Sequence, residues 1–99
     1  MLLRLMADWM YDAKNCRKNL NSCKQAFQKS KEYTRDCFQA AERCSDITDT
    51  FLLLGESEMA LDSLKMWEAN IQYAKEAQER NNIYIGIILQ YESWLSKCS

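Results

Sequence analysis

The chain of 99 residues contains no proline and only two glycines. Both residue types interrupt helices, so their scarcity favours long helices over strands joined by tight turns. Apolar residues make up 47% of the chain and charged residues 27%, a composition that is typical of a folded domain and too apolar for disorder. At this length we expect one all-α domain over residues 1–99.

Apolar side chains recur in four stretches at alternating steps of four and three residues, which is the spacing of a helix with one buried face. The stretches are 1–29, 32–54, 57–80 and 83–98. In the second stretch the repeat predicts as buried Tyr33, Cys37, Ala40, Cys44, Ile47, Phe51 and Leu54. Gly55 is typical of a residue that ends a helix, and Asn81-Asn82 is a turn signal. The pattern predicts an up-down-up-down four-helix bundle.

The connection between the first two stretches is the weakest, because Ser30-Lys31 contains neither glycine nor proline. If the chain reverses there, the apolar positions of the two stretches face each other. The facing pairs then include Cys16 with Cys44 and Cys23 with Cys37. A straight helix with the same repeat has the same symmetry, so the alternatives are a long helical hairpin or a dimeric coiled-coil-like bundle.

Charge is divided unevenly along the chain. Residues 1–30 hold six Lys/Arg and two Asp, a net charge of +4, and residues 31–80 hold six Lys/Arg and eleven Asp/Glu, a net charge of −5. A basic helix packed between acidic helices explains this division, and a basic face for an acidic partner is the alternative. The basic candidates outside the apolar repeat are Lys14, Arg17, Lys18 and Lys24. The net charge of −1 gives no indication of nucleic-acid binding.

The chain contains no histidine, so it lacks the commonest general base and the commonest metal ligand. The sequence has no glycine-rich phosphate loop and no pair of catalytic carboxylates. A nucleophilic cysteine needs a neighbouring base or a lowered pKa, and the repeat places no carboxylate beside a thiol. We therefore expect a protein that is not an enzyme and has no catalytic residues.

Four of the five cysteines, Cys16, Cys23, Cys37 and Cys44, lie in the apolar repeat. They can be small buried residues, form two disulfides between facing helices, or bind a soft metal such as Cu(I). Residues seven apart on a helix are separated by roughly 10.5 Å along its axis. The four sulfurs therefore cannot share one zinc ion at bonds of about 2.3 Å.

The segment from Asp36 to Thr48, DCFQAAERCSDIT, resembles a stretch of the cysteine-rich four-helix-bundle copper-binding proteins. In both, six residues separate two cysteines, and a small residue, Asp and Ile follow. The resemblance implies a core that binds copper through thiolates, with the ligands Cys16, Cys23, Cys37 and Cys44. In the second half of this chain other residues occupy the matching positions, namely Trp67, Ile71, Ala74, Ile87 and Trp94. The resemblance thus implies one or two copper ions at most.

Several apolar side chains near the two ends of the chain lie beside the repeat. They are Leu3, Leu5, Met10, Ile85, Ile88 and Leu89. They either widen the buried stripe or form an exposed patch, and such a patch usually marks a partner surface. We expect a non-enzymatic helical protein without a cofactor that acts by protein–protein interaction, as an adaptor, chaperone, immunity or regulatory protein. Its partner would be another protein or a second copy.

Three sequence features bear on the compartment. Arg4 and Asp8 interrupt the N-terminal apolar stretch too early for a secretory signal, and the apolar run 83–89 is far shorter than the roughly 20 residues of a membrane span. The odd number of cysteines leaves at least one free thiol or a link between chains, and abundant thiols fit a reducing compartment. We expect a cytoplasmic protein without membrane contact.

Overall fold

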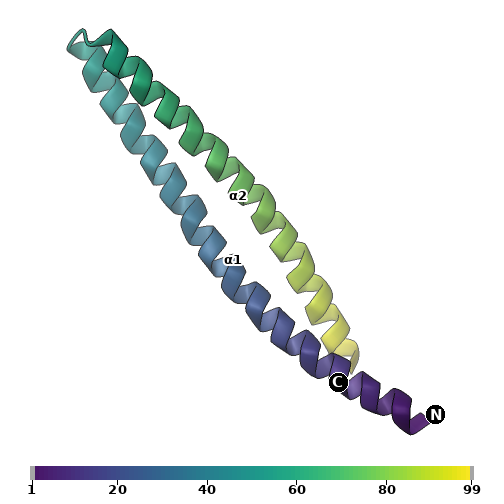
Figure 1. Cartoon of the computed structure of the whole chain (residues 1–99). Coiled ribbons are helices and arrows are strands. Elements are labelled where there is room, and N and C mark those ends of the chain that lie inside the picture. The colour runs from purple at the N-terminus through teal and green to yellow at the C-terminus, as the bar shows by residue number, and fades with distance from the viewer. Residues whose placement is uncertain (1, 99) are drawn as a thin grey trace. The chain divides into compact units, whose positions relative to one another are not determined.

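The computed structural model describes the backbone of residues 2–98 and the side chains of residues 14–97. Over these residues the protein is an all-α helical hairpin of two long helices, joined by a single turn and without strands (Figure 1). Helix α1 comprises Leu2–Leu53 and helix α2 comprises Ser57–Cys98. The four-helix bundle predicted for a single chain is therefore wrong, and the alternative of a long helical hairpin is confirmed.

Helix α1 runs through Ser30-Lys31 without reversing direction. Neither residue breaks a helix, because both have a backbone N–H and a side chain that tolerates helical φ and ψ. The Thr34 hydroxyl donates a hydrogen bond to the Ser30 carbonyl at 2.8 Å, so the polar group of Thr34 is satisfied within the helix. The predicted reversal at Ser30 is wrong, and the facing pairs that depend on it do not form.

Helix α2 likewise continues through Asn81-Asn82, where a turn was expected. Asparagine is less favourable than alanine inside a helix by at most about 0.7 kcal/mol, and tertiary packing routinely overrides a difference of this size. Asn81 is half-buried, so its place in the helix is supported by packing. A pair of asparagines is thus a weaker signal than a proline or a glycine at the same place.

The turn between the helices follows the expectation for Gly55, which has a φ of 76°. Its N–H donates to the Leu52 carbonyl at 3.1 Å, and the Glu56 N–H donates to the Phe51 carbonyl at 2.9 Å. These two bonds form a Schellman motif, which satisfies the last carbonyls of α1. The Glu56 carbonyl then accepts from Ala60 N–H at 2.9 Å and begins α2, whose first turn carries Glu58.

The chain divides into two compact units, and each is described by itself. The terminal unit comprises Met1–Lys29 and Asn81–Ser99, and the turn unit comprises Ser30–Arg80. Each unit contains one segment of α1 and one segment of α2. The unit boundaries coincide with Ser30 and Asn81, two of the three places where the sequence predicts a break between helices. The backbone does not reverse at either of them.

The core of the turn unit is built from small side chains. On α1 the buried residues are Thr34, Cys37, Ala41, Cys44 and Thr48, and on α2 they are Ala60, Ser63, Ala74 and Ala77. These positions follow steps of three and four residues or their sums, and we call them the seam. The seam shares Cys37 and Cys44 with the predicted repeat. At the other α1 positions the buried residue lies one place later than predicted, because Thr34 and Thr48 are buried while Tyr33 and Ile47 are exposed. Small residues let the two helix backbones approach closely, and the buried Thr48 hydroxyl is satisfied by the Cys44 carbonyl at 2.8 Å.

The terminal unit contains larger side chains between its helix segments. Cys16 and Leu20 are buried, and the rings of Phe27 and Tyr84 meet at a centroid distance of 6.4 Å. Three further residues of α2 at the same spacing are half-buried, namely Ile88, Tyr91 and Leu95. Neither helix has, over the residues described, a stretch long and apolar enough to cross a membrane.

Candidate interaction surface

The four cysteines of the repeat all lie on α1 and are free thiols. Cys16 and Cys23 belong to the terminal unit, and Cys37 and Cys44 belong to the turn unit. Within each unit the two cysteines are seven residues apart, which corresponds to roughly 10.5 Å of helix. A disulfide requires Cα atoms within about 6.8 Å, so neither unit can form one between its two cysteines.

The disulfides suggested from the sequence, Cys16–Cys44 and Cys23–Cys37, need α1 to reverse at Ser30. Because α1 continues there, the structure does not bring these pairs together. The two cysteines of the turn unit instead act as small core residues. Cys44 Sγ lies 4.0 Å from Asn70 Nδ2, and this amide also donates to the Met66 carbonyl at 2.9 Å.

Among the residues described, no group of three or more His, Cys, Asp or Glu side chains could hold a metal ion. A two-coordinate Cu(I) site needs only two thiolates. The two cysteines of each unit are separated by roughly 10.5 Å along the helix axis, which is too far for both thiolates to bind one ion. Copper binding through Cys16, Cys23, Cys37 and Cys44 stays a prediction that rests on the resemblance alone.

The predicted interface residues are distributed over more than one environment. Ile85 and Leu89 are 42% and 60% exposed and lie one turn apart on α2, as expected for a patch. Ile88 is half-buried and belongs to the row that packs between the helix segments. The remaining three, Leu3, Leu5 and Met10, lie in α1, but their side chains are outside the residues that the structure describes. The structure thus brings together one exposed pair of the six predicted residues.

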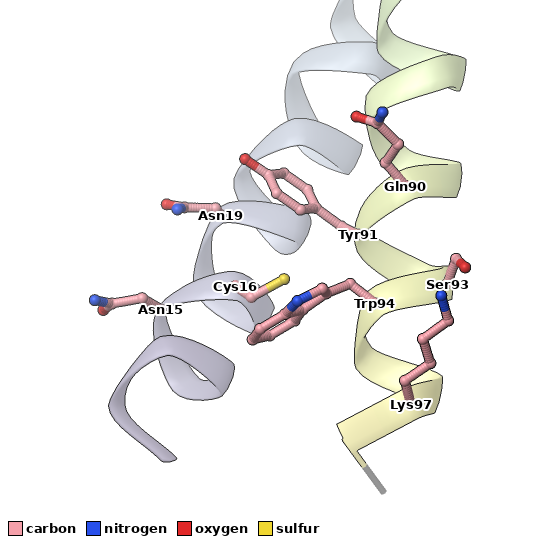
Figure 2. Close-up of a pocket in the computed structure, with 8 residues that line it drawn as sticks. All are labelled: Asn15, Cys16, Asn19, Gln90, Tyr91, Ser93, Trp94 and Lys97. Carbon is pink, nitrogen blue, oxygen red and sulfur yellow. The ribbon is translucent and has the colours of Figure 1, made fainter. Parts of the chain in front are cut away.

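An open groove of about 650 Å³ lies along the terminal unit. Its lining consists of Asn15, Cys16 and Asn19 from α1 and Gln90, Tyr91, Ser93, Trp94 and Lys97 from α2. Figure 2 shows Tyr91 and Trp94 extending from α2 toward α1, with Cys16 between the helices. The groove therefore offers aromatic surface, amide groups and one cation, and no acidic residue lines it.

The turn unit carries a larger apolar surface beside its seam, which we call the turn-unit flank. It consists of Tyr33, Ala40 and Ile47 on α1 and Met59, Met66 and Tyr73 on α2. Apart from half-buried Ala40, these residues are 44–60% exposed. The two rows lie on one side of the helix pair, because the Arg80 guanidinium, seven residues after Tyr73, lies 5.8 Å from the centre of the Tyr33 ring.

One residue of the turn-unit flank, Tyr33, has a pKa above its ordinary value. A hydrogen bond with the Cys37 side chain raises the pKa of Tyr33, partial desolvation raises it further, and the charge of Arg80 lowers it in part. Tyr73 contributes to the same environment. These interactions place the two rows of the flank within electrostatic reach of each other.

The six residues of the turn-unit flank carry no charge, although positions beside the seam of a two-stranded coiled coil usually do. The repeat predicts Tyr33, Ala40 and Ile47 as core residues, and the structure places them next to the core. The signal for the second row is the spacing of seven from Met59 through Met66 to Tyr73. Large apolar residues beside a seam are typical of helices that pack against more than one neighbour.

Comparison with protein-family models, curated proteins and solved structures found no match for this chain.

Proposed function

We propose that this protein is a non-enzymatic helical interaction protein that binds another helical surface through the turn-unit flank. The observation that carries the proposal is that small apolar residues fill the core of the turn unit while large apolar residues remain on its surface. The buried apolar residues of the turn unit are alanines and cysteines only, whereas Ile47, Met66 and Tyr73 remain 47–60% exposed. Large apolar side chains that a protein leaves beside a small core are available to a partner.

The energetic reason is the limited burial that two helices provide. Full burial of a large apolar side chain stabilises by about 1.5–3 kcal/mol relative to exposure. Each helix of a pair can cover only one face of the other, so the flank residues realise little of this gain within the chain. A partner that covers the flank supplies it, and methionine side chains adapt well to such a surface.

The exposed pair Ile85 and Leu89 is part of the proposal as a second apolar contact, in the terminal unit. The proposal includes the roles expected for such proteins, as adaptor, chaperone, immunity protein or regulator, and a cytoplasmic location, since abundant thiols fit a reducing compartment.

Position-specific photo-crosslinking in cells that produce the protein tests the proposal. A photoreactive residue at Ile47 or Met66 should form crosslinks to a discrete protein species. The matched control positions are Gln39 and Gln72, which are exposed on the same helices outside the flank, and they should give none. Equal labelling from all four positions, or no crosslink from the flank, would contradict the proposed function.

Titration of the reduced protein with Cu(I) tests the copper-binding alternative. If the resemblance to the copper-binding bundles holds, one or two ions bind tightly, and replacement of Cys16, Cys23, Cys37 and Cys44 by serine abolishes uptake. Uptake that is absent, or unchanged in the serine variant, contradicts this alternative.

A further inference from the structure

The chain itself carries a surface that complements the turn-unit flank. We infer that the turn unit of one copy docks on the groove side of the terminal unit of a second copy, with acidic residues facing basic ones. This inference rests on the proposed function and names the partner as a second copy of the chain.

The turn-unit flank has an acidic border. Residues three positions after a helical residue lie beside it on the surface, and for the flank these are Asp36, Arg43 and Thr50 on α1 and Asp62, Ala69 and Glu76 on α2. All six are exposed. Asp36 lies 3.9 Å from Arg35, and Glu76 accepts a hydrogen bond from Gln72 at 3.3 Å. These contacts leave the carboxylates in solvent. The border carries three acidic groups and one basic group, and the Arg80 guanidinium near the Tyr33 ring adds a second cation at one end of the flank.

The groove of the terminal unit has a basic border. Lys97 lines the groove, and Lys29 follows Asn15 on the same row of α1 at steps of seven residues. Both lysines are exposed. The acidic residue Glu92 is engaged elsewhere, because it pairs with Lys24 at 3.2 Å. Between the lysines, Tyr91 and Trp94 offer aromatic surface to apolar side chains.

The charges of the whole units agree with those of the two borders. The turn unit contains six Lys/Arg and eleven Asp/Glu, whereas the terminal unit contains seven Lys/Arg and three Asp/Glu. Opposite charges favour contact between unlike units of two copies and disfavour contact between like units.

Two-fold symmetry makes a second copy a sufficient partner. In a two-fold dimer the turn unit of each copy packs against the terminal unit of the other copy, so the same contact forms twice. Each flank then lies against a second pair of helices, and four helices pack together. The four-helix arrangement predicted for one chain would thus form from two.

Sedimentation equilibrium of the purified full-length chain, with reductant to prevent disulfides between chains, tests the inference. We expect a species of twice the chain mass of 11.7 kDa. Ile47→Asp with Met66→Asp should give a monomer, and the matched control Gln39→Asp with Gln78→Asp, at exposed positions outside the flank and its border, should remain a dimer. A wild-type protein that is still a monomer at about 100 μM overturns the inference.

Charge reversal tests the docking partner without touching the core. Replacing Asp36, Asp62 and Glu76 by lysine should raise the dimer Kd roughly tenfold or more, and so should Lys29→Glu with Lys97→Glu. All five changes in one chain should restore the Kd to within about threefold of wild type. A dimer that neither set weakens, or that the combined variant does not restore, overturns the contact between unlike units.

The two tests separate this inference from the proposed function. Flank crosslinks to a different protein, together with a monomeric purified chain, overturn the second copy as partner but leave the interaction function intact. A lack of crosslinks from the flank contradicts both. Circular dichroism of the aspartate variant verifies that it remains helical; if it unfolds, the exposed charge variants alone decide the inference.

Discussion

The two units of this protein use the same pair of helices in different ways. The turn unit has a seam of alanine, cysteine, serine and threonine and an uncharged flank of exposed large residues. The terminal unit places larger side chains such as Leu20 and Phe27 between its helix segments and has an ion pair across them, Lys24–Glu92. The buried residues of the turn unit are therefore all small, whereas the terminal unit packs several large apolar side chains between its helix segments and leaves others, such as Ile85 and Leu89, exposed.

This difference shows that a continuous repeat does not imply a uniform core. Where small residues fill the seam, the helices can approach closely and the large residues are displaced to the side. Where larger residues fill it, they occupy the space between the helices, and the positions beside them can carry charge. Four substitutions or sets of substitutions test this contrast, beginning with the largest expected effect.

Enlarging a seam alanine should break the close approach of the helices in the turn unit. Ala74 is fully buried, and Ala74→Leu adds three carbon atoms where the seam has no room for them. We expect a loss of about 2 kcal/mol in the free energy of unfolding, the typical cost of overpacking. Urea unfolding at fixed chain concentration measures it. The control is Gln78→Leu at an exposed position of the same helix outside the flank and its border, which should change stability by less than about 0.5 kcal/mol.

The two glycines, one in each unit, should respond in opposite directions. Gly55 has a φ of 76°, which costs an L-residue about 1 kcal/mol, so Gly55→Ala should destabilise by that amount. Gly86 lies within α2, and a Cβ atom added there meets nothing within 4 Å in the described structure. Gly86→Ala should therefore stabilise by up to about 1 kcal/mol. Thermal unfolding of the two variants beside wild type compares them, and changes of the same sign would contradict the assignment.

The Lys24–Glu92 pair of the terminal unit should contribute little. Both side chains are about half-exposed, and exposed ion pairs contribute about 0.2–1 kcal/mol. A double-mutant cycle with Lys24→Ala and Glu92→Ala measures the coupling in the free energy of unfolding. The coupling should diminish in 1 M salt because exposed charges are then screened. A coupling that salt leaves unchanged would indicate that the pair is more buried than the structure shows.

The smallest effect concerns the titration of Tyr33 in the turn-unit flank. The Cys37 hydrogen bond raises the pKa of Tyr33, and Arg80 lowers it in part. In a pH titration, the tyrosinate absorbance of wild type minus that of Tyr33→Phe reports the ionisation of Tyr33. The midpoint of this difference should lie above about pH 10. Arg80→Gln should move this midpoint higher still.

The raised pKa of Tyr33 also decides how its contribution to stability changes with pH. The neutral form is favoured in the folded state, so the contribution of Tyr33 is present below its unfolded pKa and is lost as the pH rises through its folded pKa. A midpoint at or below the ordinary value would contradict the contact with Cys37.

Much of the fold can be predicted from local sequence. The scarcity of proline and glycine predicts helices, Gly55 predicts the end of α1, and the negative charge after it suits the start of α2. The candidate patch is predicted in part, since Ile85 and Leu89 are exposed as expected. These features depend on single residues or on near neighbours in the chain.

The rest required the packing of the two helices against each other. Tyr33 and Thr34 are adjacent, and a repeat that ranks residues by hydrophobicity selects the tyrosine for the core. Close approach of two backbones instead favours the smaller threonine, whose hydroxyl bonds to its own helix.

The sequence by itself determined that this protein is helical, that a helix ends at Gly55, and that apolar residues outnumber the places in a narrow core. Only the tertiary structure decided that Ser30-Lys31 and Asn81-Asn82 continue their helices and that the large residues lie beside the seam. The physical reason is that the preference of one residue for a turn or for burial is worth at most about 3 kcal/mol. The summed packing of a whole helix face exceeds it.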